Sequence, residues 1–154
     1  MLNGIPYVLS PDLFKYMMEM GHGDEIVFTD SNFPIHTLGQ RVVRADGTDM
    51  KELLRAVLKF FPLDTYAQPV YLMEKVKGDN VETPIWEDYK EIINPYTNAE
   101  IEHMERFEFY ERAKKAYAIV MTGEMAQYSN IILKKGCVLK SNEDLKIVFI
   151  IKLL

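Results

Sequence analysis

The chain has 154 residues, of which 48% are hydrophobic and 27% are charged. This balance fits one folded domain with a single core and argues against intrinsic disorder. Lys and Arg total 18 against 23 Asp and Glu, a net charge of −5, which argues against a nucleic-acid partner because phosphate binding needs a clustered basic surface.

The sequence shows neither a secretion signal nor a membrane span. Residues 1–9 lack a basic leader and a long apolar run. The apolar run at residues 147–151 is far shorter than the ~20 residues that a spanning helix needs. A single cysteine, Cys137, leaves no intrachain disulfide. We therefore expect a cytoplasmic protein with no membrane partner.

Helices and short apolar strands alternate along the chain. In chain order, the pattern predicts a helix at residues 11–20, strands at 25–29 and 41–44, a helix at 49–61, a strand at 70–76, helices at 84–93 and 107–116, and strands at 117–121 and 130–134. The first helix has the clearest signals, because Ser10 suits the cap, Pro11 suits the first turn and Gly21 suits the end.

This alternation predicts an α/β fold, a single layered domain with a central, mostly parallel sheet flanked by helices. The domain is expected to span residues 1–140, and residues 141–154 form a C-terminal extension of unknown role. Residues 141–144 are predicted to form a turn, and residues 145–154 are apolar except for Lys146 and Lys152 and rich in β-branched residues. A free tail of this kind would favour aggregation. We expect it to add a strand or to pack across a subunit contact.

Polar side chains gather at the ends of the predicted strands, where loops of an α/β sheet present binding groups. His22 lies in a glycine-flanked turn before the strand at 25–29, and Asp30 follows that strand. Residues 128–130 precede the last predicted strand. Planar hydrogen-bonding groups with nearby aromatic rings suit carbohydrates, but they suit other polar metabolites equally, and each residue also has a purely structural interpretation.

The spacing of the histidines and acids fits no metal or cofactor motif. His22, Asp24 and His36 match neither zinc nor non-haem iron spacing, and His103 is distant in sequence. The turn around His22 lacks the further glycines and the lysine of a phosphate loop. Nucleophile-elbow, paired-cysteine and dinucleotide patterns are also missing. We expect neither a metal nor a cofactor.

Four longer strings carry a family resemblance. They are EMGHGDEIVFTD at residues 19–30, RVVRADG at 41–47, RFEFYERA at 106–113 and YSNIILKKG at 128–136. In order and spacing they closely resemble the bacterial L-fucose mutarotases, whose wider family includes the D-ribose pyranases. The resemblance runs over about residues 1–138.

The resemblance implies a ribose-pyranase-like fold and an isomerase that interconverts the α and β pyranose anomers of L-fucose. It also implies homo-oligomeric rings, typically decamers built from pentamers, with active sites near subunit contacts. His22 matches the family's proton donor. The positions that match sugar-binding residues are Asp30, Arg106, Tyr128, Ser129 and Asn130.

The implied reaction is ring opening and closure. The ring oxygen accepts a proton, the anomeric hydroxyl loses one, and rotation about C1–C2 precedes reclosure. A histidine near its ordinary pKa can exchange protons at neutral pH. Tyr128 is a candidate for the second proton-handling group.

Two positions bear on the fit to this family. Relatives usually have Gly or Ala at Ser129, and a serine is tolerated if the backbone there avoids positive φ. Ribose pyranases tend to have His at the position of Arg106, which favours fucose as the main substrate. Two alternatives stay open: a D-ribose pyranase, and a non-catalytic monosaccharide-binding or transport-accessory module.

Overall fold

The computed structural model describes residues 1–140. Residues 141–154 lie outside this part, and with them the predicted role of the extension. The elements in chain order are α1 (Pro11–Glu19), β1 (Glu25–Thr29), α2 (Ile35–Leu38), β2 (Val42–Ala45), α3 (Met50–Leu58), β3 (Val70–Met73), α4 (Ile85–Ile93), β4 (Glu102–Met104), α5 (Arg106–Lys115), β5 (Ala118–Thr122) and β6 (Ile131–Lys134).

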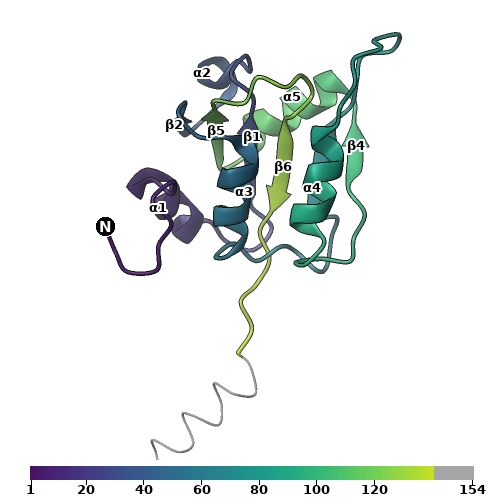
Figure 1. Cartoon of the computed structure of the whole chain (residues 1–154). Coiled ribbons are helices and arrows are strands. Elements are labelled where there is room, and N and C mark those ends of the chain that lie inside the picture. The colour runs from purple at the N-terminus through teal and green to yellow at the C-terminus, as the bar shows by residue number, and fades with distance from the viewer. Residues whose placement is uncertain (141–154) are drawn as a thin grey trace, which may run out of the picture.

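The strands form one mixed sheet in the order β2-β5-β1-β6-β3-β4. β2, β5 and β1 are mutually parallel, as are β3 and β4, whereas β6 is antiparallel to both of its neighbours, β1 and β3. The other five strands therefore point the same way, and the predicted mostly parallel sheet is confirmed. Their carboxyl ends share one edge of the sheet, at the top of Figure 1, with the amino end of β6.

Helices cover both faces of the sheet (Figure 1). One buried cluster joins Ile26 and Phe28 of β1 to side chains of α1, α3 and α4, and a second joins Val27 to side chains of α2 and α5. This alternation follows from strand geometry, since successive side chains point to opposite faces. Among the described helices, none is long and apolar enough to cross a membrane.

Local sequence signals explain where α1 and α3 begin. The hydroxyl of Ser10 accepts a hydrogen bond from the Leu13 amide at 3.2 Å, and the carboxylate of Asp49 accepts from two amides in the first turn of α3. Such caps satisfy amides that the helix itself leaves unpaired.

The sequence pattern missed two short elements, α2 and β4, and extended β3 three residues too far. α2 has four residues and β4 has three, too few for a helical or strand period to appear. β4 lies at the edge of the sheet, and two of its side chains are exposed. It therefore lacks the apolar alternation of a buried strand.

The cap of α3 gives a stability prediction. Asp49→Ala removes the acceptor for the amides of Lys51 and Glu52, and we expect it to lower the free energy of unfolding by ~1 kcal/mol in urea denaturation. Asp49→Asn retains a capping oxygen and is expected to stay close to the wild type. Equal losses in the two variants would contradict a capping role.

Candidate functional site

Asp30 and Asn130 form a buried pair at the carboxyl edge of the sheet. The register of β1 and β6 places Phe28 opposite Ile131, so the residues just beyond these strands meet. The Asn130 side-chain oxygen accepts from the Asp30 amide at 2.9 Å, and its NH₂ group donates to the Asp30 carboxylate at 3.1 Å. Two segments 100 residues apart in sequence are thereby held in one fixed arrangement.

The Asp30 carboxyl group sits in an environment that opposes its charge. The residue is only 8% exposed, and this burial raises the pKa of Asp30 above its usual value, with a further contribution from the negative charge of Glu124. Hydrogen bonds from the Asn32 amide and from Asn130 act in the opposite direction. Asp30 is thus a fixed acceptor with little access to water.

Tyr128 lies in the turn that leads into β6 and has a φ of 58°, a left-handed conformation that is unfavourable for an aromatic residue. Its carbonyl accepts a hydrogen bond from the Trp86 indole at 2.7 Å, and its hydroxyl donates to Asp79. Ser129 is not among the residues with positive φ, so the condition for tolerating its side chain is met. Its carbonyl accepts from the Tyr89 hydroxyl at 2.8 Å.

Arg106 reaches the same edge as the first residue of α5, two positions after β4 ends. Its Nε is buried without a hydrogen-bond partner among residues 1–140, and its guanidinium lies 4.6 Å from the Phe107 ring centroid. The hydrogen bond to Asp79 raises the pKa of Tyr128, and the positive charge of Arg106 opposes this shift. The edge therefore carries a guanidinium whose Nε–H has no acceptor in the described part of the chain.

His22 lies at the opposite edge of the sheet and pairs with Asp64. The Nε2 atom is 3.2 Å from Oδ1 of Asp64, whose side chain is 3% exposed against 44% for His22. The amide of Tyr66 and then His22 hold the pKa of Asp64 below its usual value, so the carboxylate accepts and Nε2 carries the hydrogen. Nδ1 does not take part in this contact.

Asp64 is the residue that the sequence pattern did not reveal. It lies 42 positions from His22 in the loop after α3, and no spacing rule connects them. The isolated bridge between Leu63 and Lys135 brings this loop beside the segment after β6. The pair is thus produced by the sheet topology.

The structure brings five of the six predicted site residues to one edge and leaves His22 at the other. We call Asp30, Arg106, Tyr128, Ser129 and Asn130 the carboxyl-edge cluster. β1 lies between Asp30 and His22, and its four residue steps span roughly 13 Å at ~3.3 Å each. A single chain therefore does not place the His22 imidazole against this cluster.

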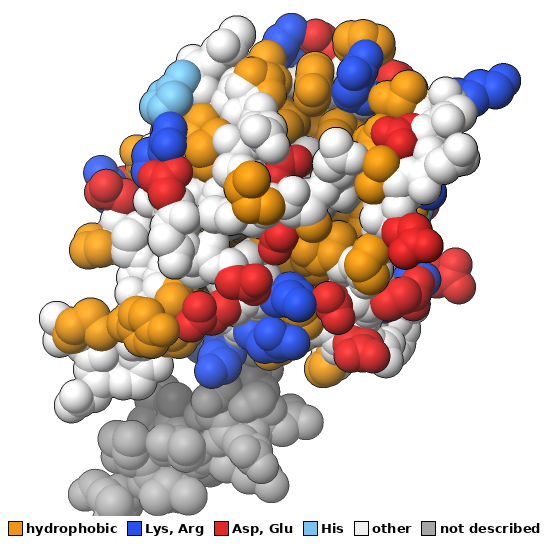
Figure 2. Space-filling model, turned by 45° about the horizontal axis from the view of Figure 1, so that its top comes forward, with side chains coloured by type: hydrophobic (Ala, Val, Ile, Leu, Met, Phe, Trp, Pro, Cys, Tyr) orange, Lys and Arg blue, Asp and Glu red, His pale blue; other side chains and the backbone are white. Residues whose placement is uncertain are grey.

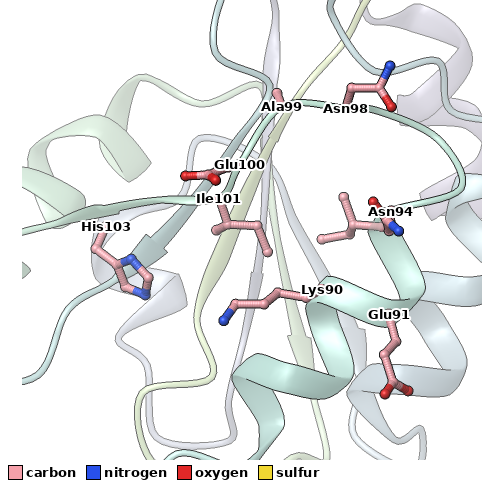
Figure 3. A pocket seen from close by; sticks show the side chains of 9 residues that line it. Lys90, Glu91, Asn94, Asn98, Ala99, Glu100, Ile101 and His103 are labelled. Atoms are coloured by element: carbon pink, nitrogen blue, oxygen red, sulfur yellow. The ribbon is translucent and has the colours of Figure 1, made fainter.

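Two hollows of the described surface lie outside the carboxyl-edge cluster. Figure 2, which turns the upper end of Figure 1 toward the viewer, shows hydrophobic side chains and carboxylates next to one another on that end. A hollow of about 540 Å³ beside the His22–Asp64 pair is lined by residues 64–69 and 96–99. Another of about 700 Å³ lies between α4 and residues 98–103 (Figure 3) and contains none of the predicted site residues.

A metal site is not formed by the described side chains. Over residues 1–140, no group of three or more His, Cys, Asp or Glu residues is arranged to hold an ion. The carboxyl-edge cluster instead offers neutral and charged hydrogen-bonding groups around aromatic rings.

Comparison with known proteins identifies the family. Residues 3–138 match the RbsD / FucU transport protein family. The chain belongs to this family.

Solved structures agree with this assignment. The fucose mutarotase of Streptococcus pneumoniae, in complex with L-fucose, is 46% identical, with a TM-score of 0.85 over 90% of this chain and 100% of that one. FucU from Bifidobacterium longum is 49% identical, with a TM-score of 0.86 over 89% and 100% of the two chains. RbsD of Bacillus subtilis, complexed with D-ribose, is 24% identical, covers 85% and 95% of the chains with a TM-score of 0.67, and supports the fold alone.

Burial of Asp30 leads to a prediction about pH. Because its pKa is raised in the folded protein, the folded state retains a proton that the unfolded state releases above about pH 4. The contribution of Asp30 to the free energy of unfolding therefore falls as pH rises from about 4 through the raised pKa of the folded protein. Relative to wild type, Asp30→Asn is expected to gain stability from pH 4 to pH 7 in urea denaturation. A difference that does not change with pH would contradict the raised pKa.

Proposed function

We propose that this protein is an L-fucose mutarotase, an isomerase that interconverts the α and β pyranose anomers by opening and closing the ring. The observation that carries the proposal is the carboxyl-edge cluster. It combines the buried Asp30–Asn130 pair with Arg106, whose Nε has no partner among the described residues. A relative of 46% identity over nearly the whole chain has L-fucose bound, which supports fucose as the sugar.

The cluster offers the groups that a pyranose requires. Asp30 is a fixed acceptor for a sugar hydroxyl, and Asn130 keeps it in place through two hydrogen bonds. Arg106 supplies directed donors to hydroxyl oxygens. Because these partners are held before the sugar arrives, little ordering has to occur on binding.

His22 and Asp64 supply the proton transfer in this proposal. A carboxylate that accepts from Nε2 fixes the tautomer and stabilises the imidazolium, so His22 can protonate the ring oxygen and take the proton back on closure. A positioned acid or base of this kind contributes typically ~10²–10⁴-fold to a rate. Tyr128 is the proposed partner at the anomeric hydroxyl.

The two halves have to come from different copies of the chain, because β1 separates them within one copy. We therefore include a homo-oligomer in the proposal, with His22 of one subunit facing the carboxyl-edge cluster of the next. Each half displays an exposed aromatic side chain suited to an interface, Tyr66 at 79% beside His22 and Phe107 at 61% beside Arg106. A decameric ring in the cytoplasm, as the resemblance implies, completes this proposal.

Two other functions fit less well. A D-ribose pyranase has the same fold, but the arginine at position 106 favours the fucose branch of the family. A binding module that only captures or delivers sugar needs no proton donor, whereas His22 is paired with a buried carboxylate. The His22–Asp64 pair therefore favours an enzyme.

The first test replaces the proton donor. His22→Ala and His22→Gln are expected to slow α/β exchange of L-fucose by ~10²–10⁴-fold, measured by NMR exchange spectroscopy, while sugar binding in calorimetry is retained. His36→Ala is the matched control, because His36 is exposed and its Nε2 lies 3.3 Å from Nη1 of Arg44, away from Asp64. A wild-type exchange rate in His22→Ala would show that His22 is not the proton donor.

The second test addresses the choice of sugar. Arg106→His removes the directed guanidinium donors and is expected to reduce exchange of L-fucose more than pyranose interconversion of D-ribose in the same NMR assay. Equal losses for both sugars would mean that Arg106 has a structural role or contacts hydroxyls common to the two.

A further inference from the structure

The hydroxyl of Tyr128 is held by the loop between β3 and α4. It donates to Oδ2 of Asp79 at 2.5 Å and accepts from the Val76 amide at 3.4 Å. Both partners lie at the carboxyl end of β3, in the loop that projects from the upper end of Figure 1. The single hydrogen of the phenol is therefore committed to Asp79.

Asp79 is itself fixed by its own turn. Its amide donates to the Val76 carbonyl at 2.9 Å, and its Oδ1 accepts from the Val81 amide at 3.0 Å. Gly78, with a φ of +89°, allows the chain to turn sharply at this point. Since Oδ1 already serves the turn, the bond from Oδ2 to Tyr128 is a separate contact that the turn does not require.

From this geometry we infer that Asp79 is a positioning residue for the proposed mutarotase reaction, acting through Tyr128. By taking the phenol hydrogen, it leaves the Tyr128 oxygen as an acceptor toward the carboxyl-edge cluster, where the anomeric hydroxyl of the sugar would bind. The inference rests on the proposed function and names the group that receives the second proton.

The proton balance is complete with these residues. On ring opening, the anomeric O–H proton moves to the Tyr128 oxygen as the phenol's own proton moves to Oδ2 of Asp79. The anomeric C–O⁻ becomes C=O, the bond from C1 to the ring oxygen breaks, and its electron pair stays on the ring oxygen, which takes a proton from the imidazolium of His22. Ring closure on the other face of C1 reverses each transfer, so no outside acid, base or oxidant is needed.

The surrounding charges support this arrangement. Asp79 raises the pKa of Tyr128, whereas Arg106 lowers it. The hydrogen bond from Tyr128 in turn lowers the pKa of Asp79, and the positive charge of Lys75 adds to this effect. At neutral pH the pair is thus a phenol and a carboxylate, the forms that the transfer requires.

The test is a double-mutant cycle with a matched control. Asp79→Asn retains an oxygen for the turn but removes the base, and we expect it to slow fucose exchange roughly tenfold or more. Glu82→Gln removes the same charge from an exposed position in the same loop and is expected to leave the rate unchanged. In the Tyr128→Phe background, Asp79→Asn should cause no further loss, because its effect passes through the phenol.

A spectroscopic measurement separates this role from a merely structural one. With [13Cζ]tyrosine labelling, the signal of Tyr128 is assigned by its absence in Tyr128→Phe. Its pKa is expected to fall in Asp79→Asn and to stay unchanged in Glu82→Gln. A fall in rate without a change in this pKa would overturn the inference.

The remaining outcomes are also decisive. If Asp79→Asn exchanges fucose as fast as Glu82→Gln, or slows the Tyr128→Phe variant further by the same factor, Asp79 does not act through Tyr128. A wild-type protein that fails to exchange fucose would overturn the proposed function and the inference with it, whereas a null result confined to Asp79→Asn overturns the inference alone.

Discussion

The antiparallel pairing of β6 between β1 and β3 determines where each functional side chain lies. Because β6 runs against its neighbours, its amino end meets their carboxyl ends, and Asn130 pairs with Asp30. A parallel β6 would place residues 128–130 at the far edge. The same pairing carries Lys135 to the edge of His22, where its carbonyl accepts from the Gly23 amide at 2.8 Å.

The parts of this arrangement that local chemistry determines are predictable from the sequence. Ser10 determines the start of α1, and Asp49 determines the start of α3. The run at residues 25–29 likewise predicts a buried strand without help from distant residues. The α/β class follows from their alternation. The family resemblance also suggested six candidate site residues, and five of those six lie together at one edge.

The remaining features of the site depend on contacts between residues that are distant in the sequence. Asp64 meets His22 and Asp79 meets Tyr128 across 42 and 49 positions, and no periodicity or motif connects either pair. The separation of His22 from Asp30 is likewise invisible in a sequence where they stand eight positions apart, because it depends on β1 being extended between them. Each candidate proton-handling group therefore forms a hydrogen bond with a carboxylate, and these two pairings become visible only in the folded chain.

The central claim is that proton donor and sugar-binding groups meet between two copies of the chain, and complementation tests it most directly. His22→Ala and Arg106→Ala, each inactive alone, are co-expressed and their fucose exchange is measured by NMR. Random mixing yields one intact interface in four, so roughly a quarter of the wild-type rate should return. Mixed assemblies that contain both variants and stay as slow as either one alone would contradict a shared site.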